Sequence, residues 1–139
     1  MVHRRFLNKK TATNGSQALP TTPTELDLLT EQLIAFRDER DWRQFHSLKN
    51  LIVSLNLEAA ELLELTQWKS DEDIEAAIGS QEFSQKAAEE CADILLYLLL
   101  ISERAGLDLI AAAKAKIAKN AEKYPVEKSK GNARKYTEL

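Results

Sequence analysis

The sequence predicts an all-α fold, a bundle of four main helices that assembles into an oligomer. Apolar residues recur at three- and four-residue spacing along several long stretches, which is typical of amphipathic helices. Only four glycines and three prolines interrupt 139 residues, too few for a turn-rich β fold. A chain of this length, 44% hydrophobic, is expected to form one domain with its own core.

Local signals mark most of the expected helix ends. Thr22 can cap the first helix, with Pro23 in the first helical position and Glu25 completing a capping box, and this helix extends to about residue 40. Gly106 suits a left-handed terminator for the third helix, and Asp108 can cap the fourth. The second, third and fourth helices are expected at about 46–68, 83–104 and 109–124, with one or two further turns around 74–78.

The chain divides into three parts. Residues 1–21 are polar and show little periodicity, so we expect a disordered N-terminal arm. Residues 22–125 contain the four main helices and form the helical domain. Residues 126–139 form a basic C-terminal tail.

The third helix is apolar on every side from Ile94 to Ile101. A helix in a small monomeric bundle keeps one face in water, whereas a helix that is apolar all round is buried all round. We therefore expect a homo-oligomer, either a dimer or a tetramer, packed through this helix. The alternative is a centrally placed helix in a monomer, which the short chain disfavours.

Charge is unevenly distributed along the chain. Residues 58–93 hold eleven acids and two lysines, whereas residues 114–135 hold eight basic residues and two glutamates. An acidic centre and a basic segment suit a metal site beside a phosphate-binding segment. Solvated helix faces are the more ordinary explanation of such runs.

Nothing in the composition points to export or to a membrane. Cys91 is the only cysteine, so no intrachain disulfide can form. No apolar segment of the secretory type follows Arg4 and Arg5, and the longest apolar run is too short to span a bilayer. A cytoplasmic protein is expected.

Four acids lie within otherwise apolar helix faces. Glu58 has leucines three, four and seven residues away, and Glu61 follows it by one turn. Glu90 lies at helical spacing from an equally apolar set that includes Tyr97, and Asp93 follows Glu90 by three residues. A carboxylate at a position that would bury leucine is costly unless it is paired or binds a cation. These acids are therefore candidate metal ligands, whereas most other acid pairs in the chain are expected in solvent.

If the second and third helices pack side by side, the two acid pairs can face each other, because acids three residues apart lie about 5–6 Å apart on a helix. An all-oxygen cluster is the preference of Mg²⁺, which commonly bridges to substrate phosphates. The metal can activate water and stabilise charge on phosphoryl oxygens. No Ser/His/Asp set and no glycine-rich phosphate loop is recognised, so the residues suit phosphoanhydride hydrolysis better than acyl transfer.

The order Glu58-x-x-Glu61 and then Glu90-x-x-Asp93 resembles the E-x-x-E…E-x-x-D signature of the MazG-like, all-α nucleoside triphosphate pyrophosphohydrolases. The resemblance runs from about residue 25 to residue 139 and is closest to the dCTP pyrophosphatase branch. Four further segments carry it, namely 41–46 (DWRQFH), 67–69 (QWK), 93–98 (DILLYL) and 134–139 (RKYTEL).

The resemblance implies a Mg²⁺-dependent hydrolase that splits a nucleoside triphosphate into monophosphate and pyrophosphate, with residues 22–125 as the catalytic domain of a helical dimer or tetramer. It also implies dCTP or a modified dCTP as substrate, and so a role in cleaning the nucleotide pool. By matched position, the metal ligands and catalytic acids would be Glu58, Glu61, Glu90 and Asp93.

The resemblance further implies a set of nucleotide-binding residues. Trp42, Trp68 and Tyr97 would line the base and sugar pocket, and Lys116 and Asn120 would approach the phosphates. Each of these tryptophans, taken alone, is more often a core residue than a ligand platform. Leu33 stands where a nucleotide-contacting histidine is expected on the first helix, which leaves the base preference open.

The sequence also allows three alternatives to be compared with this prediction. A related enzyme acting on dUTP or on a damaged nucleotide is the first. A four-helix di-iron protein is the second, but that design needs Glu-x-x-His pairs, and Arg43 stands three residues before His46. A non-enzymatic oligomerisation module is the third, and it would leave four acids on apolar faces unexplained. Neither a nucleic acid polymer nor a membrane is expected as a partner.

Overall fold

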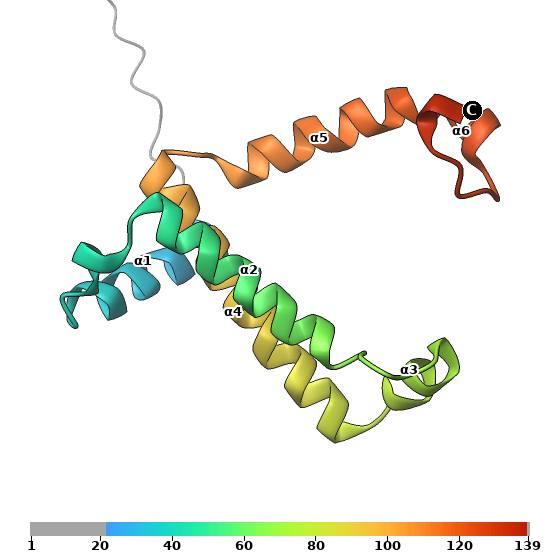
Figure 1. The fold of residues 1–139 in the computed structure, drawn as a ribbon. Coiled ribbons are helices and arrows are strands. Elements are labelled where there is room, and N and C mark those ends of the chain that lie inside the picture. Colours follow the sequence, from blue (N-terminus) through green and yellow to red (C-terminus); the bar gives the residue numbers. More distant parts are fainter. Residues whose placement is uncertain (1–21, 139) are drawn as a thin grey trace, which may run out of the picture.

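Every regular element in the part of the chain that the computed structural model describes, residues 22–138, is a helix (Figure 1). The predicted all-α class is therefore confirmed, while the arm predicted at 1–21 lies outside the described residues. The elements are α1 (Glu25–Asp38), η1 (Trp42–Phe45), α2 (Leu48–Glu64), α3 (Asp71–Ala77), α4 (Gln81–Ala105), α5 (Leu109–Lys123), α6 (Val126–Ser129) and η2 (Tyr136–Glu138).

The centre of the structure is the antiparallel pair of α2 and α4, which lie side by side along most of their length (Figure 1). The short helix α3 belongs to the connection between them. Among the described residues, the buried apolar side chains are Leu51 on α2 and Leu99 and Leu100 on α4. This pair is the scaffold that positions the candidate acids.

The predicted start of the first helix is wrong by two residues. Thr24 is the N-cap: its hydroxyl accepts a hydrogen bond from the Asp27 N–H at 3.2 Å, and the Asp27 carboxylate accepts one from the Thr24 N–H at 2.8 Å. Thr24 and Asp27 form a complete capping box, which replaces the box predicted for Thr22 and Glu25. The two signals predicted between the third and fourth main helices are confirmed. Gly106, which ends α4, has a left-handed backbone with φ of 65°, and the Asp108 carboxylate, at the start of α5, accepts a hydrogen bond from the Ala111 N–H.

The second helix is shorter than predicted at both ends. It begins after its N-cap Ser47, whose hydroxyl accepts from the Asn50 N–H, and it ends at Glu64. The residues after it form turns, and Trp68 has a left-handed backbone with φ of 62°. Trp68 therefore leaves the face that an unbroken helix to residue 68 would have given it.

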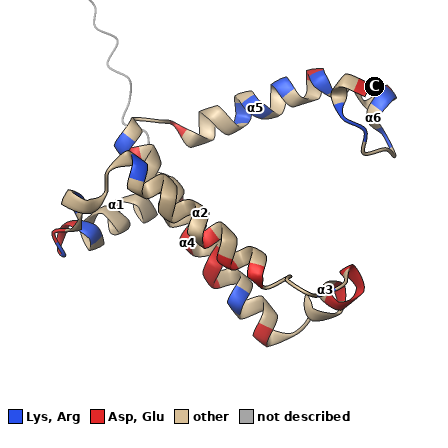
Figure 2. Cartoon of the chain, viewed as in Figure 1, with Lys and Arg blue, Asp and Glu red and all other residues tan. Residues whose placement is uncertain are grey.

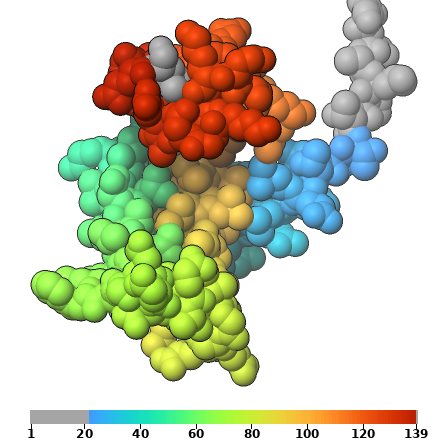
Figure 3. Space-filling model, turned by 90° about the vertical axis from the view of Figure 1, so that its right-hand side faces the viewer, coloured from blue at the N-terminus to red at the C-terminus, as the bar shows by residue number. Residues whose placement is uncertain are grey.

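Four main helices are present, but they do not close into a bundle within one chain. α1 crosses α4 near the carboxyl end of α4, whereas α5 extends away from the α2–α4 pair (Figure 1). Several large apolar side chains remain exposed, among them Trp68 at 94% and Ile117 of α5 at 69%. In the space-filling view, the surface of α4 lies open between α2 and α1 (Figure 3).

Charge separates along the fold as it does along the sequence. Acidic residues gather on the middle of the α2–α4 pair and on α3, while lysines follow α5 and the segment beyond it (Figure 2). The opposite charges therefore lie on different parts of the same chain. No helix among residues 22–138 is long and apolar enough to cross a membrane.

Candidate metal and nucleotide site

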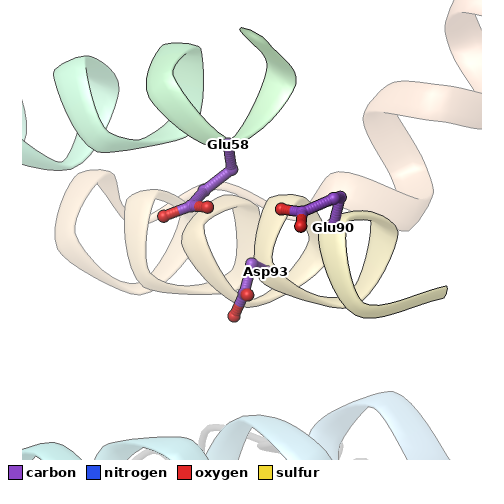
Figure 4. A group of neighbouring side chains, drawn as sticks. All are labelled: Glu58, Glu90 and Asp93. Carbon is purple, nitrogen blue, oxygen red and sulfur yellow. The ribbon is translucent and has the colours of Figure 1, made fainter. Parts of the chain in front are cut away.

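Three of the four predicted acids meet across the α2–α4 pair. Glu58 comes from α2, and Glu90 and Asp93 come from successive turns of α4 (Figure 4). One carboxylate oxygen from each of the three lies within 4.8 Å of the other two. Glu58 and Glu90 are half-buried and Asp93 is exposed, so the group opens to solvent on one side.

The carboxylates in this group repel one another. The pKa of Glu58 is raised above its usual value by burial first, and then by the charges of Glu61, Asp93 and Glu90. Burial and the same acidic neighbourhood also raise the pKa of Glu90. None of the ion pairs among residues 22–138 involves these acids. The group therefore carries negative charge without a basic partner, which is the electrostatic condition that favours a bound cation.

Glu61, the fourth predicted acid, is exposed and lies outside the three-residue group. Its charge nevertheless raises the pKa of both Glu58 and Glu90, which places it beside them. Glu61 is one turn after Glu58 on α2 and is thus an outer member of the same acidic surface.

A cavity of about 230 Å³ adjoins the acids. Glu58 and Asp93 form part of its wall, and Trp42 and Tyr97 lie in the same wall. The Trp42 ring packs edge-on against Phe36 with ring centroids 5.9 Å apart. The full lining is Leu33, Phe36, Arg37, Trp42, His46, Glu58, Asp93, Leu96, Tyr97 and Leu100. The arrangement joins carboxylates to an aromatic pocket, the two features needed to hold a nucleotide by its phosphates and its base.

Two basic residues that line this cavity, Arg37 and His46, were not among the predicted site residues. The Nδ1 atom of His46 is buried without a hydrogen-bond partner, and the pKa of His46 is lowered by burial and by the charge of Arg37. Arg37 itself is 3% exposed. The sequence did contain a signal for Arg37, since it follows Leu33 by four residues and so shares the apolar stripe of α1.

The remaining predicted site residues lie elsewhere in the single chain. Trp68 is exposed beyond the end of α2, and Lys116 and Asn120 are exposed on α5, which points away from the acids (Figure 1). None of the three lines the cavity beside Glu58. A larger cavity of about 550 Å³, between the first turns of α1 and α5, contains none of the predicted site residues.

The fold and the site define a class, that of all-helical proteins with a carboxylate group held between two antiparallel helices. Residues 53–139 match the sequence model of the MazG-like family, and the chain belongs to that family. The predicted family resemblance is therefore confirmed, and the protein is an enzyme, a hydrolase similar to the pyrophosphatases described next.

Two relatives and one solved structure show the extent of the similarity. Bovine (Bos taurus) dCTP pyrophosphatase 1 is 38% identical over 131 residues, which cover 94% of this chain and 77% of the relative. The rat (Rattus norvegicus) dCTP pyrophosphatase 1 is 44% identical over 108 residues, covering 75% of this chain and 61% of the relative. A crystal structure of a pyrophosphatase from Archaeoglobus fulgidus is 37% identical with a TM-score of 0.69, and the match covers 78% of this chain and 99% of that one.

Proposed function

We propose that this enzyme hydrolyses dCTP, or a modified dCTP, to the nucleoside monophosphate and pyrophosphate. The observation that carries the proposal is the junction of the acid group of Glu58, Glu90 and Asp93 with a cavity lined by Trp42 and Tyr97. The mammalian relatives are dCTP pyrophosphatases, which supports the choice of nucleotide.

Mg²⁺ is the proposed cofactor. The donor set fits it, because the three ligand atoms are all carboxylate oxygens and lie within 4.8 Å of one another. Burial first, and then repulsion by neighbouring acids, raises the pKa values of Glu58 and Glu90, and a bound cation would favour their charged forms. When bound, Mg²⁺ would supply activated water and charge stabilisation for the transferred phosphoryl group. Glu61 is proposed as a fourth ligand or as a partner of the coordinated solvent.

The aromatic wall would orient the substrate. Trp42 and Tyr97 offer ring faces and edges on which a base can pack, and Leu33 and Leu96 close the same cavity with apolar surface. A base held there leaves the phosphates beside Glu58 and Asp93. Water attacks the α phosphorus in the proposed reaction, the bond to the bridging oxygen breaks, and pyrophosphate leaves.

A homo-oligomer, a dimer or a tetramer, is part of the proposal. Two observations support it: α4 remains open between α2 and α1, and Leu95 in its apolar run is 39% exposed (Figure 3). The basic helix α5 points away from the acids of its own chain (Figure 2). We propose that Lys116 and Asn120 of a neighbouring subunit approach the phosphates, and that Trp68 likewise serves a neighbour's pocket.

A product assay tests the function. Purified enzyme with Mg²⁺ is incubated with dCTP, 5-methyl-dCTP, dUTP and dTTP, and the products are separated chromatographically. We expect dCMP and pyrophosphate from dCTP, and no dCDP. In ¹⁸O-labelled water the label should appear in dCMP, because the α phosphorus is attacked. Release of orthophosphate, or a preference for dUTP, would contradict the proposal.

A further inference from the structure

Arg37 is the one buried charged side chain among residues 22–138. Removing a guanidinium from water is costly unless its donors find acceptors. Two are provided: Nε donates to Asp38 Oδ1 at 2.7 Å, and Nη1 donates to Glu103 Oε2 on α4 at 3.1 Å. The second of these bonds ties α1 to α4 beside the candidate site.

These two bonds leave several N–H groups of the guanidinium free to donate to a ligand. The group has five N–H donors, and only Nε and Nη1 have protein acceptors within the described part of the chain. Arg37 lies in the wall of the 230 Å³ cavity, together with Trp42, Tyr97 and Asp93. Burial first, and then the charge of Arg37, lowers the pKa of His46 in the same wall. A permanent cation with spare donors thus lines the pocket.

A base with two adjacent acceptors fits such donors best. Cytosine presents N3 and O2 side by side, both as acceptors, so two N–H groups of one guanidinium can meet them together. Uracil carries a hydrogen on N3, which opposes a donor at that position and leaves only single-acceptor contacts. Arginine recognises guanine in the same way, by donating two hydrogen bonds to the adjacent O6 and N7 acceptors.

We infer that Arg37 is a specificity-determining residue that selects cytosine over uracil in this cavity. The inference rests on the proposed function, because it takes the acids to hold the phosphate end and the aromatic wall to hold the base. It goes beyond that function by naming the group that reads the base. Leu33, one turn earlier on α1, offers no donor to share this role.

Binding of the monophosphates tests this inference without turnover. The affinities of the full chain for dCMP and dUMP are measured by calorimetry in Mg²⁺. We expect the wild type to prefer dCMP by about tenfold or more, as for one bidentate contact, and Arg37→Met to prefer it by less than about twofold. Arg37→Lys keeps the charge but removes the planar guanidinium that can donate two parallel hydrogen bonds, so it too should lose most of the preference. A wild type without preference, or an Arg37→Lys variant that retains it, would overturn the inference.

Two further variants separate direct contact from support of the fold. Glu103→Gln keeps a hydrogen-bond acceptor for Arg37 and should retain the dCMP preference, and a loss equal to that of Arg37→Met would show that Arg37 acts only by tying α1 to α4. Arg104→Met removes an exposed guanidinium outside the cavity and should change nothing. Release of pyrophosphate from dCTP by the wild type is measured separately, so a failure of the proposed function is distinguished from a failure of this inference.

Discussion

Glu58 on α2 and Asp93 on α4 bring carboxylate oxygens within 4.8 Å of each other across the central helix pair. Two like charges at this distance oppose the packing of the helices that carry them. The nearby Glu90 adds to the repulsion, and no ion pair among the described residues offsets it. The proposed binding of Mg²⁺ by this pair would therefore also favour the packing of α2 against α4.

Replacement of Asp93 by asparagine should abolish most of the activity while preserving the fold. The change removes one charge and keeps the shape of the side chain. We expect turnover of dCTP to fall by roughly 100-fold or more, since even the partners of metal ligands are worth 10–100-fold. Turnover is measured at saturating Mg²⁺, with Glu89→Gln, an exposed acid on the same helix, as the control. Near wild-type turnover would exclude Asp93 from the proposed metal site.

Glu58→Gln should stabilise the metal-free protein in a pH-dependent way. Because the pKa of Glu58 is raised above 4.5 in the folded state, the folded chain binds this proton more readily than the unfolded chain. Its contribution to the free energy of unfolding therefore falls as pH rises from 4.5 through the raised pKa.

Thermal unfolding in a chelator measures this effect. The glutamine variant should unfold at a higher temperature than the wild type at neutral pH, and the difference should shrink as the pH approaches 4.5. With saturating Mg²⁺ the order should reverse, because only the wild type gains the full binding energy. An equal difference at every pH would argue against the titration of Glu58 as its cause.

Lys116→Ala should raise the KM for dCTP. We expect an increase of roughly tenfold or more, from loss of a charge-assisted contact worth about 1.5–3 kcal/mol. Lys114→Ala is the control, because residues two apart lie on different sides of a helix. Steady-state kinetics at fixed ionic strength compares the variants, and an unchanged KM for Lys116→Ala would exclude this lysine from phosphate binding.

Deletion of residues 128–139 should also weaken substrate binding while leaving the metal site intact. The segment carries part of the basic charge that would offset the triphosphate. Mg²⁺ binding to the truncated chain, measured by calorimetry, should match the wild type while the KM for dCTP rises. An unaltered KM would indicate that the tail lies in solvent and does not contribute to substrate binding.

Sedimentation should detect a dimer or larger assembly at micromolar concentration. Leu95→Glu, in the apolar run of α4, should shift the wild-type assembly towards monomer, because a charge in an apolar interface is strongly disfavoured. Gln81→Glu adds the same charge at an exposed position at the start of α4 and should leave assembly unchanged. A monomeric wild type would mean that the exposed apolar surface has another function.

Much of the fold could be read from local patterns. The spacing of apolar residues located the four main helices, and Asp108 and Gly106 marked two of their ends, because caps and terminators act within a few residues. The leucines around Glu58 likewise indicated that this acid would be partly buried. The predicted start of the first helix was wrong because Thr22 and Thr24 each have an acid three residues later, and the local pattern does not distinguish between the two capping boxes; the structure forms the one of Thr24 and Asp27.

What the sequence by itself determined was the identity of the helices, the family, and the helix faces that carry the acids, since each depends on residues close together along the chain. Only the tertiary structure decided which of those faces meet. It joined Arg37 to Glu103 across 66 positions of the sequence, and it closed an aromatic cavity against Glu58 and Asp93. It also turned α5, with Lys116 and Asn120, away from the acids of its own chain (Figure 1). Periodicity indicates which face of a helix is buried, but the partner of that face depends on the directions that turns such as the one at Gly106 impose on the helices that follow.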